Sequence, residues 1–87
     1  MLGGFSEENP VDEEVSQLVN SLRNVVESRM NTQYHVFEPI SFTCQLVAGT
    51  NYEVRVRVGD EQYISVNFFQ PLPCYGTELE LTDVNSL

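Results

Sequence analysis

The chain has 87 residues, enough for one small domain with a modest hydrophobic core but not for two. Thirteen acidic residues against four basic ones, all arginine, give a formal net charge of −9. This charge argues against nucleic acid or an anionic membrane surface as a partner, because both require a positive face. Two cysteines are too few for a disulfide scaffold, and no apolar run approaches a membrane span or a secretory signal. If the chain is complete, we expect a cytoplasmic protein.

The first third of the chain predicts an arm followed by a helix. Residues 1–9 are rich in glycine and then in acidic residues, and we expect a flexible N-terminal arm there. Residues 10–31 are predicted to form one long helix, with Asn9 as the N-cap and Pro10 in the first helical position. Its apolar stripe recurs at spacings of three and four, with Val15, Leu18, Val19, Leu22, Val25 and Val26.

From residue 34 to residue 87 the apolar period changes to two, which predicts β-strands. Short turns separate the strands, so neighbouring strands should pair antiparallel. Pro39 is expected to mark a bulge or an edge position, because proline cannot donate to a ladder. The predicted fold is a single α+β domain over residues 1–87, in which one amphipathic helix covers one face of a four- to five-stranded antiparallel sheet.

Residues suited to catalysis are few and dispersed. His35 is the only histidine, and it has no recognised metal-ligand spacing with Cys44 or Cys74. Cys44 alternates with apolar residues and is expected to be a small core residue, whereas Cys74 lies in a predicted loop. No nucleotide-binding or nucleophile motif is present. We therefore expect no catalytic residue, no metal and no cofactor.

Three segments are apolar where a surface is usually polar. They are the start of the arm and two predicted turns, and the meander brings both turns to the same end of the sheet. Three uncharged segments on a chain of net charge −9 indicate a surface that docks another protein. The candidate contact residues are Leu2, Gly3, Gly4, Phe5, Gln45, Leu46, Val47, Ala48, Gly49, Leu72, Pro73 and Cys74.

The same three segments resemble a known family. Gln45-Leu46-Val47-Ala48-Gly49 matches the Q-x-V-x-G motif of the cystatins. Its continuation Thr50-Asn51-Tyr52, the later Val58-Gly59-Asp60, the arm Gly3-Gly4-Phe5-Ser6-Glu7 and the turn Phe69-Gln70-Pro71-Leu72-Pro73 are similar to the stefins, the type 1 cystatins. The resemblance covers about residues 3–82, nearly the whole chain.

The resemblance implies a sheet wrapped around one long helix and reversible, tight inhibition of papain-like cysteine proteases such as cathepsins. If the family's binding mode applies to this sequence, the arm around Gly3 and Gly4 would occupy the non-primed subsites of the protease. The turns at Gln45–Gly49 and Leu72-Pro73 would occupy the primed side. The resemblance implies that the inhibitor forms no bond to the catalytic thiolate of the protease. The resemblance also implies a cytoplasmic protein that is active as a monomer, with a possible domain-swapped dimer that opens the Gln45–Gly49 turn and loses inhibition.

Three features depart from the stefin pattern. Two alternative functions also remain beside protease inhibition. Cys74 stands where stefins usually carry another small or polar residue, the chain stops at Leu87, and lysine is absent. One alternative is a non-inhibitory protein-binding module on the same fold, since fold does not fix function. Another is a small enzyme that uses Cys74, which would require an activated thiol.

Overall fold

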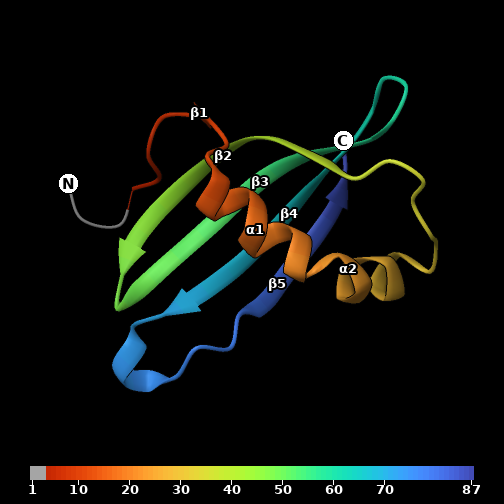
Figure 1. Ribbon diagram of the computed structural model, residues 1–87. Helices are drawn as coiled ribbons and strands as arrows, with labels where there is room; N and C mark the ends of the chain where they lie inside the picture. The colour runs from red at the N-terminus through yellow and green to blue at the C-terminus, as the bar shows by residue number, and fades with distance from the viewer. Residues whose placement is uncertain (1–3) are drawn as a thin grey trace.

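The structure is a computed structural model that describes residues 4–87 (Figure 1). Two helices lie against one face of a five-stranded sheet, and a short 3-10 helix, η1, lies in the loop before the last strand. The elements in chain order are β1 (Asn9–Pro10), α1 (Glu13–Ser21), α2 (Arg23–Met30), β2 (Glu38–Val47), β3 (Gly49–Gly59), β4 (Gln62–Pro71), η1 (Pro73–Tyr75) and β5 (Glu80–Ser86).

The sheet is an antiparallel meander in the order β1-β2-β3-β4-β5, and the predicted α+β class is confirmed. Alternation along the strands sends one set of side chains toward the helices and the other toward solvent. Among the described residues, no helix is long and apolar enough to cross a membrane. The buried core is made of Val15, Val19, Leu22, Val26, Phe37, Tyr52, Val54, Val56, Ile64, Val66, Phe68 and Val84.

A bulge in β2 confirms the expectation at Pro39. The register with β3 shifts between Pro39, which pairs with Val56, and Ser41, which pairs with Arg55. The extra residue, Ile40, is exposed although its sequence parity placed it with the core face. The bulge thereby resets the alternation, since one inserted residue moves every later side chain to the other face.

The helical region begins later than the sequence predicted. Asn9 and Pro10 pair with Phe42 and Ser41 as the short strand β1, so Asn9 is not the N-cap. The cap is Asp12, whose carboxylate accepts the backbone N–H of Val15 at 2.8 Å. Pairing with the edge of β2 outweighs the local helix-start pattern at residues 9 and 10.

The predicted single helix over 10–31 is also interrupted, because Leu22 separates α1 from α2. Leu22 has φ −95° and ψ 0°, outside regular helix geometry, and its N–H bonds to the carbonyl of Val19 at 3.0 Å. The hydroxyl of Ser21 donates to the carbonyl of Leu18 at 2.6 Å, a local bond that competes with the helical ladder and bends helices. The buried Leu22 remains in the core.

Replacing Asp12 by alanine tests the assignment of the cap. Loss of a side-chain N-cap costs about 1 kcal/mol of protein stability. We expect Asp12→Ala to lower the free energy of unfolding in urea by that amount, while Asn9→Ala changes it by less than about 0.5 kcal/mol, as for an ordinary surface substitution. Equal losses in the two variants, or a larger loss in Asn9→Ala, would contradict the assignment.

A charged network fixes the connection from α2 to β2. The Glu27 carboxylate accepts the backbone N–H of Tyr34 at 2.9 Å and the Nε–H of Arg23 at 3.3 Å. Arg23 also donates to the carbonyl of Tyr34, and its guanidinium lies 5.4 Å from the ring centroid of Phe37. The hydrogen bond from Tyr34, followed by Arg23, lowers the pKa of Glu27 below its ordinary value of 4.5, although burial acts in the opposite direction.

This lowered pKa predicts how stability depends on pH. A carboxyl group whose pKa is depressed by folding stabilises the protein above its unfolded pKa, and loses that contribution as the pH falls through the folded value. We expect Glu27→Gln to lower the free energy of unfolding at pH 7 and the difference from the parent to vanish below the folded pKa. The exposed Glu78→Gln serves as the control, and an equal loss at pH 7 and at pH 3 would refute the role of the charge.

Candidate functional site

Three segments that are distant in sequence meet at one end of the sheet, on the left of Figure 1. They are the first described residues of the chain, the β2–β3 turn, and the loop that contains η1. The β3–β4 turn and the C-terminus lie at the opposite end. We call the exposed surface at this end the apolar rim, and its residues are Gly4, Phe5, Leu46, Val47, Ala48, Leu72, Pro73, Cys74 and Tyr75.

The β2–β3 turn projects apolar side chains into solvent. Val47 pairs with Gly49, so Ala48 alone lies between the two strands. Leu46 is 73% exposed and Val47 is 49% exposed, which is unusual for aliphatic residues in the centre of a hairpin. Folding therefore leaves these side chains available to a partner.

Gly49 is required at this turn by close packing. Its φ is +128°, a backbone conformation that residues with a side chain rarely adopt. A Cβ at this position would lie 2.5 Å from Cζ of Phe69 and 2.6 Å from the carbonyl oxygen of Gln70, both in β4. The turn consequently lies directly against β4, and β4 leads into the η1 loop.

The base of the same turn is held by a side-chain hydrogen bond. Gln45 pairs with Asn51 across the two strands, and the Asn51 amide donates to Oε1 of Gln45 at 3.2 Å. Both residues are partly buried. Gln45 and Gly49 thus shape the turn, whereas Leu46, Val47 and Ala48 form its exposed surface.

The second loop of the rim is a single 3-10 turn. The N–H of Tyr75 bonds to the carbonyl of Leu72 at 2.9 Å, and Gly76 ends the turn with φ +119°. Leu72, Pro73 and Cys74 are all exposed, as is Tyr75, whose side chain is 74% exposed. Sequence reasoning stopped at Cys74 and missed Tyr75. The sequence feature that points to Tyr75 is an aromatic residue inside a segment rich in proline and glycine.

The N-terminal segment reaches the rim along β2. Gly4 and Phe5 are exposed, and the next residue, Ser6, bonds through its N–H to the carbonyl of Cys44 at 2.7 Å. Cys44 lies three positions before Val47, so this contact brings Phe5 close to the β2–β3 turn. The candidates Leu2 and Gly3 lie outside the described residues.

Three of the four arginines are paired within the described part of the chain. Arg23, Arg55 and Arg57 each form an ion pair within the chain, with Glu27, Glu8 and Glu38 respectively. The described residues of the rim include no Asp, Glu, Lys, Arg or His. Two carboxylates lie beside the rim, because Glu78 and Glu80 line one hollow together with Tyr75.

The described residues offer little that is suited to catalysis or metal binding. His35 is exposed in the connection before β2, Cys74 is exposed, and Cys44 is partly buried against the core. Within residues 4–87, no group of three or more His, Cys, Asp or Glu side chains is arranged to hold a metal ion.

Two turns and an N-terminal segment thus form one exposed apolar surface at the end of a sheet packed against helices. The cystatin domain family model matches residues 3–85, so the chain belongs to the cystatin family. The chain is 38% identical to cystatin-A of Felis catus over 80 residues, which span 92% of this chain and 82% of the relative. It is 36% identical to the leukocyte cysteine proteinase inhibitor 1 of Sus scrofa over 93% of this chain and 79% of that protein.

Cystatin-B of Homo sapiens is 36% identical over 95% of this chain and 85% of its own length. The resemblance to the stefin type is therefore confirmed by relatives of both the cystatin-A and the cystatin-B kind.

Substitution of Gly49 tests the packing at the turn. Strained backbone and overpacking each cost about 1–3 kcal/mol, so Gly49→Ala should lower the free energy of unfolding by about 2–6 kcal/mol. Gly76→Ala is the matched control, because Gly76 also has positive φ but a Cβ there meets no atom within 4 Å. We expect the smaller loss in Gly76→Ala, and equal losses would show that close packing against Phe69 plays no part.

Proposed function

We propose that this chain is a reversible, tight-binding inhibitor of papain-like cysteine proteases and acts by covering the active-site cleft with the apolar rim. The observation that carries the proposal is the convergence of three apolar, exposed segments on one end of a cystatin domain. The inhibitor forms no covalent bond with the protease and excludes substrate by occupying the cleft. We propose that the chain has no enzymatic activity of its own.

The geometry supports tight binding for a physical reason. A surface that exists before binding loses little conformational entropy on docking, so more of the interaction energy is retained as affinity. The close packing of Gly49 on Phe69 and the hydrogen bond between Asn51 and Gln45 hold the turn in one shape. Burial of Leu46, Val47 and Leu72 would contribute about 25 cal/mol per Å² of apolar area before the costs of association.

Gly4 differs from Gly49 in a way that favours this function. A Cβ on Gly4 would meet no atom of the chain within 4 Å, so nothing in the described fold requires glycine there. Close approach of a partner's surface is a reason to lack a side chain at this position. We infer that Gly3 and Gly4 let the arm pass along the non-primed subsites, while the two turns occupy the primed side.

We further propose cathepsin-type proteases as targets, the cytoplasm as the location, and a monomer as the active form. A domain-swapped dimer would open the Gln45–Gly49 turn and should not inhibit. The competing proposal is a protein-binding module that has lost inhibition. Gly4 and the exposed apolar side chains of Leu46 and Val47 favour inhibition, since the fold itself requires none of them and a non-inhibitor would have no need of them.

Two substitutions in the rim test the function. Val47→Asp would bury an unpaired charge in the protease cleft, at a cost of about 3 kcal/mol or more, so the inhibition constant for papain should rise about 100-fold or more. Gly4→Arg should also weaken inhibition by blocking close approach. Because both positions are exposed, neither substitution should change the free energy of unfolding by more than about 0.5 kcal/mol.

The measurement is steady-state inhibition of active-site-titrated papain by the purified monomer, with Glu61→Gln at the opposite end of the sheet as the control. The chain that lacks residues 1–5 is assayed alongside and should bind more weakly than the parent. Inhibition that is absent from a folded monomer at micromolar concentration would favour the non-inhibitory module. Unchanged inhibition by both rim variants would show that another surface binds the protease.

A further inference from the structure

The N-terminal segment is attached to β2 over a greater length than its two-residue strand. Among the described residues, regular strand pairing of this segment with β2 is limited to the pairs Asn9–Phe42 and Pro10–Ser41. On one side, the N–H of Val11 bonds to the carbonyl of Ile40 at 3.0 Å, and on the other, Ser6 bonds to Cys44. The segment from Ser6 to Val11 thus follows the edge of β2 toward the rim.

Ser6 makes two bonds with the backbone of a single residue. Its N–H donates to the carbonyl of Cys44 at 2.7 Å, and its side-chain oxygen accepts the N–H of Cys44 at 3.0 Å. In a regular antiparallel pair the acceptor would be a backbone carbonyl. The Ser6 hydroxyl takes the place of that carbonyl, so both the N–H and the carbonyl of Cys44 are bonded to Ser6. Cys44 lies two positions beyond Phe42, the last residue of β2 that pairs with β1, on the side toward the rim.

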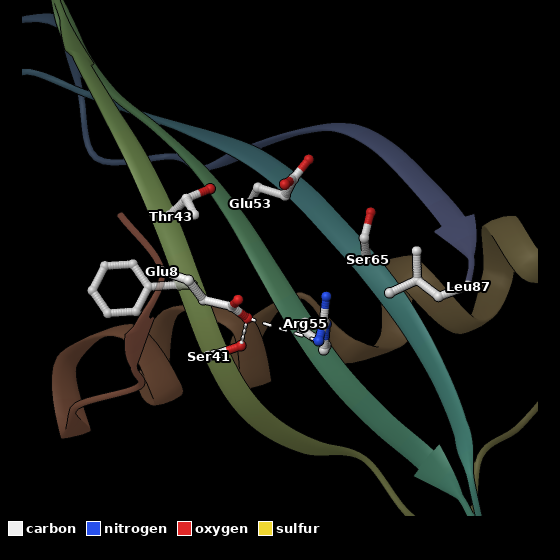
Figure 2. A pocket seen from close by; sticks show the side chains of 8 residues that line it. Glu8, Ser41, Thr43, Glu53, Arg55, Ser65 and Leu87 are labelled. Atoms are coloured by element: carbon white, nitrogen blue, oxygen red, sulfur yellow. Dashed lines mark hydrogen bonds and ion pairs between the residues drawn. The ribbon is translucent and has the colours of Figure 1, made fainter. Parts of the chain in front are cut away.

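Glu8 anchors the same segment through its side chain on the solvent-facing side of the sheet. Figure 2 shows its carboxylate reaching across β2, where Oε2 accepts the hydroxyl of Ser41 and lies 3.9 Å from Nη1 of Arg55 in β3. Glu8 and Arg55 are both about half exposed, so the ion pair adds little energy and acts mainly through its geometry. By contrast, the neighbouring Glu7 is exposed and shows no side-chain bond among the described residues.

We propose that Ser6 and Glu8 form an arm clamp, which positions the N-terminal arm beside the β2–β3 turn before a protease binds. This inference rests on the proposed function. The clamp holds the chain immediately after Phe5, so it restricts where Gly4 and Phe5 can lie relative to Val47. Restricting the arm in advance lowers the entropy lost when it enters the cleft, and the clamp residues therefore act as positioning residues without having to touch the protease.

The test is a double-mutant cycle between the clamp and the arm. Ser6→Ala and Glu8→Ala are made in the full chain and in the chain that lacks residues 1–5, and inhibition of papain is measured for each. We expect Ser6→Ala to raise the inhibition constant about tenfold in the full chain, because it leaves the Cys44 N–H without its acceptor, and by less than about twofold in the shortened chain. Ser6→Thr, which keeps the hydroxyl, should restore inhibition.

Glu7→Ala is the matched control for Glu8→Ala, because both remove one negative charge from adjacent positions. Glu8→Ala should weaken inhibition in the full chain more than Glu7→Ala does. Hydrogen exchange at the Cys44 amide gives a readout that does not depend on any protease. Exchange there should accelerate about tenfold or more in Ser6→Ala while the core amides of Val54 and Val66 keep their protection.

The possible results separate the clamp from the proposed function. A parent chain that fails to inhibit papain would overturn the proposed function and the clamp's role in it. A parent that inhibits, with Ser6→Ala equally potent, would overturn the clamp alone. An equal loss in the full and shortened chains would also overturn it, because that pattern indicates a general structural effect of Ser6 and not positioning of the arm.

Discussion

The packing of the helices' apolar stripe on β3 and β4 is the interaction on which the other features depend. Val15, Val19 and Val26 are almost completely buried, as are Val54 and Val66 opposite them. Neither the helices nor the sheet can bury its apolar face alone, so this contact fixes the meander and its register. Because the strands are antiparallel, the same register places the β2–β3 turn and the η1 loop at one end.

Two glycines at the apolar rim illustrate two different constraints on a sequence. Glycine is required at position 49 by the chain's own structure, because the backbone has φ +128° and the contact with Phe69 leaves no space for a side chain. Gly4 meets no such restriction in the described fold. Gly4 is not required by the fold and lies on a surface whose described residues include no acidic or basic side chain, which points to a requirement set by a partner. Stability and binding can therefore be separated experimentally at these two positions.

Much of the fold follows from patterns that extend over many residues. The change of apolar period after residue 34, together with short turns, predicted the antiparallel sheet, and Pro39 predicted the bulge. The errors arose where few residues decide between alternatives. Asn9 and Pro10 suit a helix start, but pairing with Phe42 and Ser41 makes them a strand. The interruption at Leu22 coincides with a side-chain bond from Ser21 to the carbonyl of Leu18, which no periodicity reveals.

The candidate site was predictable to a similar degree. Apolar residues in turns indicated Leu46, Val47 and Leu72, and the structure leaves all three exposed at one end of the sheet. Tyr75 lies in the same predicted turn but was not among the candidate contact residues, which ended at Cys74. The contacts of Ser6 with Cys44 and of Glu8 with Ser41 join residues more than thirty positions apart, so they depend on register and could not be inferred from local pattern.

Mapping the contact surface tests the central claim, that the apolar rim covers a protease cleft without covalent chemistry. The isotope-labelled monomer would be titrated with papain whose catalytic cysteine is replaced by alanine, and amide signals would be followed residue by residue. The account predicts a tight complex in which the signals of Phe5, Val47, Ala48 and Tyr75 change most and those of Glu53 and Ser65, on the solvent-facing side of the sheet, change least. Strong changes at Glu53 and Ser65 with none at the rim, or no complex without the thiolate, would contradict it.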